Sequence, residues 1–414
     1  MPYQQYRKRA ALWPVVLVLL LALLAGAAVG FAVWHNAEPD SEDLPVQPVD
    51  VPVLSKPESS EPEPEPAVVR LVGVGDNLIH EAIYKQASRR AEGQGYDFGF
   101  TYEAVEELIA SADIASINQE TVMDRNRPLS AYPCFNSPTE LGDHLEQIGF
   151  DVANLANNHV LDQNASGLAS TLDYWKTKKI RTTGAYQNEA DYQQIRLLER
   201  NGVTFSFIGM TELTNGLSLP AGSELVLLRT GEEDRIKTRI EKAKQISDVV
   251  VVNVHWGVEY THQPTASQRD LAQKMADWGA DLILGHHPHV IQPVEWLDRA
   301  DGGRSLVVYS LGNFISAQSE GPRMIGGALD VTVVKQPDGS ILLENPKFLP
   351  VVTHYDPGYA NVRTVLLRDY TEELAQNHGV RAQTPAFSLE YIHNIVTTVI
   401  DPEFLDEVPQ EPKG

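Results

Sequence analysis

The sequence has a single cysteine, Cys134, among its 414 residues. One cysteine cannot form an intrachain disulfide, so the fold must be stable without covalent cross-links. It also excludes a cysteine-rich zinc site. Because no cysteine comes directly after the apolar N-terminal segment, a lipoprotein anchor is excluded as well.

Basic residues are scarce, with 33 Lys and Arg against 56 Asp and Glu, and the formal charge is −23 at pH 7. Nucleic-acid-binding proteins normally show a basic footprint, so we expect no nucleic-acid partner. The Gly73-Val-Gly75 pair lacks the rest of a dinucleotide-binding fingerprint, which argues against a nucleotide cofactor.

The N-terminal region contains a long apolar run. Residues 11–34 carry no charge, and a helix of that length crosses a hydrocarbon core of about 30 Å. Arg7, Lys8 and Arg9 precede it, which predicts a single-pass protein of the cell membrane with residues 1–10 in the cytoplasm and the C-terminal domain outside. The alternative is a cleaved signal peptide, whose apolar region is usually about 7–15 residues. The apolar run of residues 11–34 is longer than that, which favours the membrane anchor.

The composition also indicates the boundaries of the folded part. Residues 35–66 contain nine acidic residues, one Lys and eight prolines, which predicts a disordered, extended stalk. Residues 401–414 read as a disordered tail, leaving residues 67–400 as the folded domain. Removing the −8 of the stalk and the +3 of residues 1–10 from the total leaves −18 on residues 67–414.

From residue 67, short β-branched runs alternate with helix-like stretches, which predicts an α/β sandwich with parallel strands. Polar residues follow six of these runs. Ligands bind outside the carboxyl ends of strands in open α/β sheets, so we expect these residues to converge on one site. The predicted strands are Val68–Val74, Ile114–Ile117, Val152–Ala156, Val249–Val254, Leu282–Leu284 and Leu306–Tyr309, and the predicted helices are Tyr102–Ser111, Glu140–Ile148, Ser166–Lys178, Arg235–Gln245 and Ser267–Trp278.

The residues at the strand ends are Asp, Asn, Glu and His, a set that suits Mn²⁺, Fe or Zn²⁺. A lone histidine is more often a surface or hydrogen-bonded core residue. Five of the twelve histidines fall at three of these ends, however, and that would be an odd way to build a purely structural core. Two roles are open for Asp162: it could be a partner of the site, or it could be the N-cap of the helix that follows.

Six motifs occur in one order along about residues 68–318: Val-Gly-Asp76, Asn118-Gln-Glu120-Thr-Val, Asn157-Asn-His159-Val-Leu-Asp162, His255-Trp-Gly-Val-Glu-Tyr260, Gly285-His-His-Pro-His289-Val-Ile-Gln-Pro and Tyr309-Ser-Leu-Gly-Asn-Phe314. Together they resemble the poly-gamma-glutamate capsule-synthesis family, the CapA-type proteins. That family is similar in fold to calcineurin-like metallophosphoesterases. The resemblance therefore implies an α/β sandwich of the metallophosphoesterase type and one or two divalent metals at the strand ends.

The resemblance also implies roles for individual residues. His159 resembles the histidine that protonates the leaving group, and Asp162 would orient it. The implied metal ligands are Asp76, Glu120, Asn158, His255, His287 and His289. We also predict that Asn118, His286, Glu259 and Asn313 bind substrate.

Two motifs depart from the phosphoesterase pattern. The first strand ends in Asp76-Asn77-Leu78 where those enzymes have Asp-x-His, and the second ends in Asn118-Gln-Glu120 in place of Gly-Asp-x-x-Asp. One metal position is therefore expected to be weak or lost.

Three functions remain open from the sequence. The first is a membrane-anchored external component of capsule-polymer synthesis or export, in which a metal activates water for attack on an ester or amide. The second is a non-catalytic partner that binds an anionic polymer and contacts membrane-embedded synthase subunits. The third is an extracellular metallophosphoesterase unrelated to capsule. The charge of −18 favours a metal site over a passive groove for a polyanion.

Overall fold

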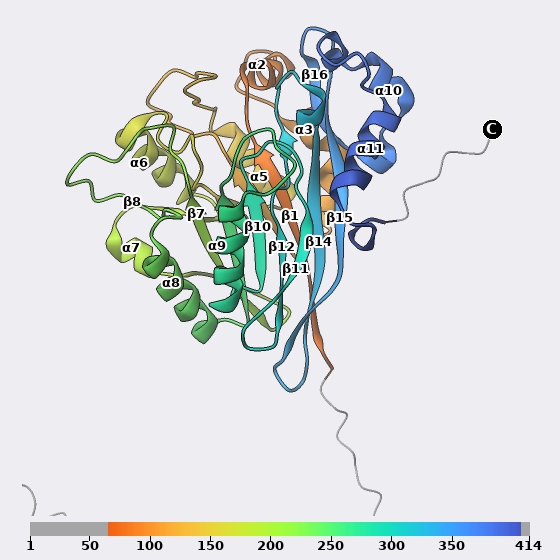
Figure 1. Cartoon of the computed structure of the whole chain (residues 1–414). Helices are drawn as coiled ribbons and strands as arrows, with labels where there is room; N and C mark the ends of the chain where they lie inside the picture. Colours follow the sequence, from red (N-terminus) through yellow and green to blue (C-terminus); the bar gives the residue numbers. More distant parts are fainter. Residues whose placement is uncertain (1–64, 407–414) are drawn as a thin grey trace, which may run out of the picture. The chain divides into compact units, whose positions relative to one another are not determined.

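Two β-sheets packed face to face form the framework of the protein (Figure 1). The structure is a computed structural model that describes residues 65–406. The first sheet has the order β16 (Ala360–Leu366), β15 (Ile341–Asp356), β14 (Ile325–Lys335), β1 (Ala67–Asn77), β2 (Ile114–Gln119), β3 (Val152–Asn154) and β4 (Arg181–Thr183), and β13 (Asn313–Ile315) pairs with β1 beside that path. The second sheet has the order β11 (Val294–Asp298), β12 (Arg304–Val308), β10 (Leu282–His286), β9 (Val249–His255), β7 (Val203–Thr211) and β6 (Arg196–Arg200). A separate short pair joins β5 (Ala185–Tyr186) to β8 (Val226–Leu227).

The central strands of both sheets run parallel. In the first sheet β1 to β4 and β13 are parallel, whereas β14 to β16 are antiparallel. In the second sheet β7, β9, β10 and β12 are parallel, with antiparallel strands at both edges. β1 runs upward in Figure 1, so the carboxyl ends of the parallel strands in its sheet lie toward the top of that view.

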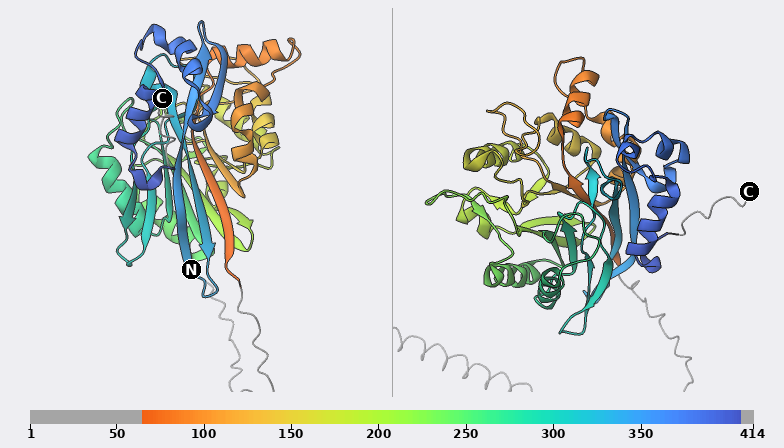
Figure 2. Two further views of the ribbon diagram at one scale, coloured as in Figure 1. Left: turned by 90° about the vertical axis from the view of Figure 1, so that its right-hand side faces the viewer. Right: turned by 45° about the horizontal axis from the view of Figure 1, so that its top comes forward.

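Helices cover the outer faces of the two sheets. α8 (Glu233–Ile246) and α9 (Ala266–Asp277) pack on the second sheet, while α10 (Glu372–Asn377) and α11 (Leu389–Val399) lie beside the antiparallel strands of the first (Figure 2). The other helices are α2 (Glu81–Arg90), α3 (Gly99–Tyr102), α4 (Glu106–Ala110), α5 (Glu140–Ile148), α6 (Asn164–Trp175) and α7 (Glu189–Gln193). Short 3-10 turns are η1 (Glu103–Val105), η2 (Gly321–Met324), η3 (Leu367–Asp369), η4 (Gly379–Ala382) and η5 (Pro402–Phe404).

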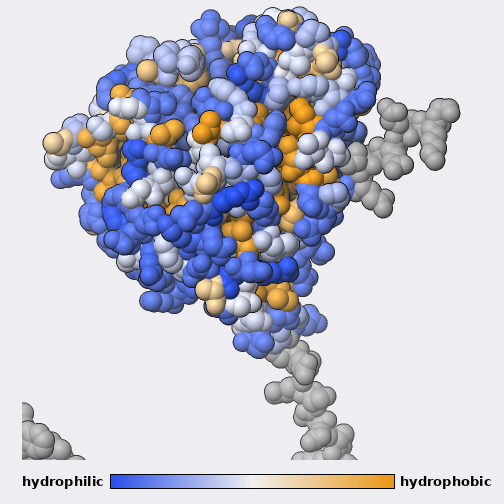
Figure 3. All heavy atoms as spheres, viewed as in Figure 1, coloured by the Kyte–Doolittle hydropathy of each residue, from blue (hydrophilic) through white to orange (hydrophobic). Residues whose placement is uncertain are grey.

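Strand β9 of the second sheet is buried on both of its faces. Val249 and Val251 belong to the core between the two sheets, whereas Val250 and Val252 pack against the outer helices. A strand buried on both faces needs a continuous apolar run, which Val249–Val252 supplies. On the outside, the face in Figure 3 is mainly hydrophilic and carries separate apolar groups.

The predicted α/β sandwich with parallel strands is confirmed at the level of architecture. α5 has the predicted bounds, whereas the helix predicted over residues 102–111 is interrupted by η1. Strand β7 was not predicted, although Val203–Thr211 is rich in β-branched and aromatic residues. At the C-terminal end, η5 falls within the range predicted as a tail, and its Phe404 is buried.

The predicted single-pass membrane localisation must be corrected. Among residues 65–406, no helix has both the length and the apolar character needed to cross a membrane. The longest of these helices, α8, has 14 residues and is rich in Glu, Lys and Arg. The predicted span at 11–34 and most of the predicted stalk lie outside the described residues.

Candidate metal centre

The sheet registers bring the predicted residues together at the strand ends. In the first sheet Asp76 is paired with Asn118 of β2 and with Asn313 of β13. In the second sheet His286, at the end of β10, is paired with His255, at the end of β9. Side-chain contacts then join the two sets across the sheets. The structure thus brings ten of the twelve predicted residues into one network of side-chain contacts, and the other two, His159 and Asp162, form a pair that follows Asn158 in the chain.

The first group of ligand atoms belongs to Asp76, Glu120 and His255, three buried residues whose ligand atoms lie within 4.8 Å of one another. Asn118 Nδ2 donates a hydrogen bond to Asp76 Oδ1 at 2.8 Å. His255 Nε2 lies 3.7 Å from Glu120 Oε1 and 3.0 Å from Asn158 Oδ1. Carboxylate, amide and imidazole atoms therefore face one another from four strand ends.

A second group consists of Glu259, His287 and His289, again with ligand atoms within 4.8 Å of one another. His289 connects the two groups, since its Nδ1 lies 3.0 Å from Asp76 Oδ2 and its Nε2 lies 3.6 Å from Glu120 Oε1. The Glu259 side chain is 41% exposed. The second group is therefore the more accessible of the two.

His159 and Asp162 form a pair beside the first group. His159 Nδ1 lies 2.7 Å from Asp162 Oδ2, and the same oxygen accepts a hydrogen bond from the backbone N–H of Phe135 at 2.7 Å. The Phe135 ring lies edge to face against His159, with 4.8 Å between centroids. α6 begins at Asn164, and its N-cap position is Gln163. The Asp162 carboxylate therefore contacts His159 and does not occupy the N-cap position of α6, and its role in orienting His159 stays a prediction.

His286 and Asn313 each lie next to one of the proposed ligand groups. His286 is fully buried, with Nδ1 at 3.6 Å from Asp76 Oδ1 and Nε2 at 3.3 Å from Asn253 Oδ1. Asn313 Oδ1 lies 3.0 Å from His289 Nδ1. Each thus contacts a predicted metal ligand, and their role in binding substrate stays a prediction.

The electrostatics of the site favour a bound cation. Burial, together with the nearby charges of Asp76 and Glu259, raises the pKa of Glu120 well above its ordinary value. Burial also lowers the pKa of His287 to about 4 and, with help from neighbouring histidines, holds that of His255 well below its ordinary value. Imidazoles that stay neutral at pH 7 are in the form that ligates metals. A divalent ion would offset the crowding of carboxylates that raises the Glu120 pKa.

Two further observations show that the donor set fits a metal. Glu120 Oε1 and His287 Nδ1 are buried without a hydrogen-bond partner among the described residues, although buried polar atoms are nearly always paired. His287 and His289 also have positive φ angles of 98° and 56°. Non-glycine residues adopt such angles rarely, and strain of this kind concentrates at functional sites.

Sequence reasoning missed His80, four residues after Asp76. Its ring lies edge to face against Phe135 at 5.3 Å, so Phe135 contacts both His80 and His159. Burial lowers the pKa of His80 to about 4. The Asp76-Asn-Leu-Ile-His80 spacing was the available signal, because it places a histidine just beyond a strand end.

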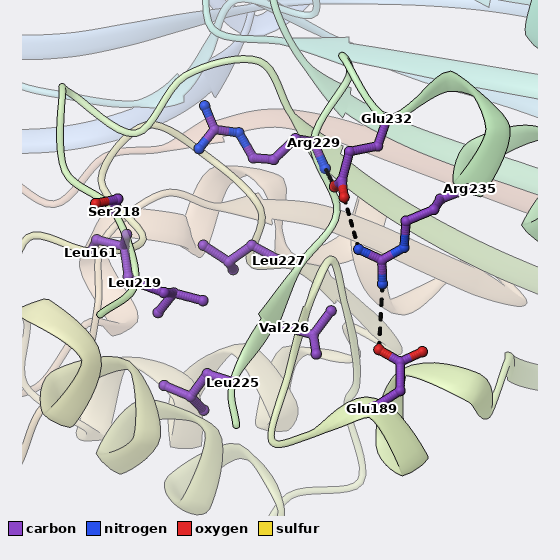
Figure 4. A pocket seen from close by; sticks show the side chains of 10 residues that line it. All are labelled: Leu161, Glu189, Ser218, Leu219, Leu225, Val226, Leu227, Arg229, Glu232 and Arg235. Atoms are coloured by element: carbon purple, nitrogen blue, oxygen red, sulfur yellow. Dashed lines mark hydrogen bonds and ion pairs between the residues drawn. The ribbon is translucent and has the colours of Figure 1, made fainter. Parts of the chain in front are cut away.

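A cavity of about 300 Å³ lies beside the loop that carries the His159–Asp162 pair (Figure 4). Half of its ten lining residues are aliphatic, and a chain of ion pairs from Glu189 through Arg235 to Glu232 lies along one side. None of the twelve predicted residues lines it. The lining residues are Leu161, Glu189, Ser218, Leu219, Leu225, Val226, Leu227, Arg229, Glu232 and Arg235.

Comparison with known proteins gives one family. The family described as "Bacterial capsule synthesis protein PGA_cap" matches residues 70–318, a segment that contains all twelve predicted residues. The chain is 31% identical over 249 residues to the PGA biosynthesis protein CapA of Bacillus subtilis (strain 168), covering 59% of this chain and 62% of the relative. It is 36% identical over 260 residues to the capsule biosynthesis protein CapA of Bacillus anthracis, covering 59% of each. The match thus spans about 60% of the length of these relatives.

Among solved structures, the putative 5'-nucleotidase from Staphylococcus aureus is similar with a TM-score of 0.44 and 13% identity, covering 69% of this chain and 55% of that one. A phosphatase from Mycoplasma pneumoniae is similar with a TM-score of 0.42 and 12% identity, covering 70% of this chain and 95% of that one.

Proposed function

Because the chain belongs to the PGA_cap family of bacterial capsule synthesis proteins, we propose that it acts in the synthesis or export of poly-gamma-glutamate capsule through a metal-dependent, hydrolase-like site. The names of its relatives, a PGA biosynthesis protein and a capsule biosynthesis protein, support the polymer. Residues 67–400 would form the functional domain, with the fold of a calcineurin-like metallophosphoesterase. Its partners would be subunits of the polymer synthase.

One observation carries the proposal of a hydrolase-like site, namely that buried ligand atoms lie beside a paired histidine and aspartate. The first ligand group contacts Asn158 through His255, and Asn158 is followed directly by His159. A purely structural cluster would not require neutral imidazoles, an ionisable carboxylate and a proton donor in one place. This combination is typical of metal-assisted hydrolysis.

The proposed ligands are Asp76, Glu120, Asn158, His255, His287 and His289, joined by Glu259 in the more exposed group. A bound divalent ion would supply Lewis acidity and lower the pKa of a water molecule. The His159 Nδ1 atom is engaged by Asp162 at 2.7 Å, so Nε2 is the nitrogen free to donate a proton to a leaving group. Asp162 and the Phe135 ring would hold the imidazole in that orientation.

The departures from the phosphoesterase pattern affect the two groups differently. Leu78, buried in the position of the missing histidine, offers no ligand atom. The Glu259, His287 and His289 group contains a carboxylate that lies 41% exposed. We assign the tighter metal position to the buried group and the weaker one to this accessible group.

Elemental analysis of the purified chain, combined with turnover assays on phosphoester and gamma-glutamyl substrates, tests the proposal. We expect one or two equivalents of Mn, Fe or Zn, and hydrolysis that stops when the metal is chelated. A chain that takes up no divalent metal would contradict the site. A chain that binds metal but hydrolyses neither substrate class would favour the alternative of a non-catalytic partner of the synthase.

A further inference from the structure

The loop that follows β7 reaches the metal centre from outside the motif-bearing strands. At its tip, Asn215 Oδ1 accepts a hydrogen bond from Asn158 Nδ2 at 3.3 Å. The Asn215 Nδ2 atom lies 3.4 Å from His159 Nδ1. One side chain thus contacts both a proposed metal ligand and the proposed proton donor.

The contact with Asn215 determines which way the Asn158 amide faces. A carboxamide has an oxygen on one side and an NH₂ group on the other, and only the oxygen can ligate a metal. The Asn158 NH₂ group points to Asn215, and its oxygen lies on the other side, 3.0 Å from His255 Nε2. If the amide were turned over, its NH₂ group would face the ligand atoms instead.

The loop itself is held firmly. Arg229 donates from Nη2 to the backbone oxygen of Glu212 at 2.8 Å and from Nη1 to Thr214 Oγ1 at 3.0 Å. Figure 4 shows the Arg229 side chain extending away from Glu232, beside the cavity. The backbone N–H of Glu212 also donates to the backbone oxygen of His255 at 2.8 Å. The loop is therefore tied to a strand end that carries a proposed ligand.

The backbone at the tip suits asparagine. Asn215 has a φ of 50° and Gly216 a φ of 74°, and asparagine is among the few non-glycine residues that adopt this left-handed conformation readily. Its side chain is thereby turned toward Asn158 and His159. Turn preference accounts for the residue type, but not for the two side-chain contacts within the site.

We propose that Asn215 is a positioning residue that holds the Asn158 amide with its oxygen toward the metal ligands. The inference rests on the proposed function, since it requires a metal at the site. Groups that hydrogen-bond to metal ligands and orient them typically contribute about 10–100-fold to metal affinity. Asn215 should therefore affect metal binding without contacting the metal itself.

The test is calorimetric titration of the full metal-free chain with Mn²⁺. Asn215→Gly keeps the positive φ and removes the amide, so Mn²⁺ affinity should fall about 10–100-fold while the melting temperature without metal stays near the parent value. Asn215→Asp keeps an acceptor oxygen for Asn158 and should retain or exceed the parent affinity. Asn201→Gly is the matched control, because Asn201 has the same φ of 50° and precedes a glycine, in the turn between β6 and β7.

The outcomes separate the inference from the function on which it rests. Parent-like Mn²⁺ affinity in Asn215→Gly, with a parent chain that binds Mn²⁺, would overturn the role of Asn215 alone. Equal losses in Asn215→Gly and Asn215→Asp would also overturn it, because the acceptor oxygen would then be irrelevant. A parent chain without Mn²⁺ affinity would overturn the metal site and this inference together. If Asn215→Gly has a lower melting temperature than the parent without metal, the Mn²⁺ affinity of Asn215→Asp is compared with that of the parent. A lower affinity in Asn215→Asp would then overturn the positioning role.

Discussion

Glu120→Gln offers a sharp test of the metal centre, because the substitution keeps the shape of a buried side chain and removes its ability to ionise. Glu120 is fully buried beside Asp76 and His255, and one of its oxygens has no hydrogen-bond partner among residues 65–406. A carboxylate in that position stabilises the protein only if a cation joins it. The glutamine should therefore abolish tight metal binding without harming the metal-free fold.

The expected size of the effect follows from mass action. A metal present at 100 times its dissociation constant stabilises the native state by about 2.7 kcal/mol. About 340 folded residues have an unfolding entropy of roughly 0.7 kcal/mol per kelvin, so the parent should gain about 4 °C in melting temperature. A 100-fold weaker affinity in Glu120→Gln leaves only about 0.4 kcal/mol at the same metal concentration, a shift of less than about 1 °C.

The pH dependence of the metal-free proteins gives a second measure. The pKa of Glu120 is raised in the folded state, so its contribution to stability is fully present below the ordinary glutamate pKa of about 4.3 and is lost as the pH rises through the folded value. Glutamine cannot ionise. Without metal, Glu120→Gln should match the parent near pH 4 and melt higher than the parent at pH 8.

Differential scanning calorimetry with and without Mn²⁺, from pH 4 to 8, measures both effects. Glu241→Gln is the control, since Glu241 lies on α8 with 49% of its side chain exposed, and it should behave as the parent in both experiments. The reasoning is refuted if Glu120→Gln retains the metal-induced shift. It is equally refuted if the difference between the metal-free proteins does not grow with pH.

Two other substitutions separate chemistry from structure. His159→Ala should lower turnover about 10²–10⁴-fold while metal content and melting temperature stay near the parent values, and normal turnover or polymer production in this variant would favour the non-catalytic role. Gly75→Ala should lower the free energy of unfolding in urea by about 1–3 kcal/mol or more, because its Cβ would lie 2.0 Å from the Gly312 backbone oxygen. Gly231→Ala is the control, since no described heavy atom lies within 4 Å of its added Cβ, and an equal loss in both variants would disprove the steric argument.

Much of the site could be predicted because parallel strands bring their carboxyl ends to one edge. Asp76 and Asn118 end neighbouring strands in register, as do His255 and His286. Asn118 and His255 directly follow an apolar run, and Asp76 and His286 follow one after a single glycine. To predict that these side chains converge, although they are far apart in the sequence, it was therefore enough to identify the strands and their direction.

The part that could not be predicted depends on loops whose path is set by tertiary contacts. Glu259 was predicted to bind substrate, and the structure places it in the second ligand group instead. There the backbone N–H of the next residue, Tyr260, with a φ of 66°, donates to the Pro288 oxygen. That contact links two loops about 28 residues apart, and no periodic pattern of residues in the sequence predicts it. Asn215 was missed for a different reason. Its Asn-Gly pair has the form of an ordinary turn, and the strand before it, β7, was not itself predicted.

The acidic charge of the domain and the chemistry of the site both call for a divalent cation. A net charge of −18 on residues 67–414 repels an anionic polymer, and Asp76, Glu120 and Glu259 add negative charge where that polymer would have to react. Burial, together with the charges of Asp76 and Glu259, raises the pKa of Glu120. A divalent cation relieves both effects, because it allows Glu120 to ionise and offsets the field that an approaching anion meets. The metal in the proposed function is thus needed for binding an anionic substrate as well as for activating water.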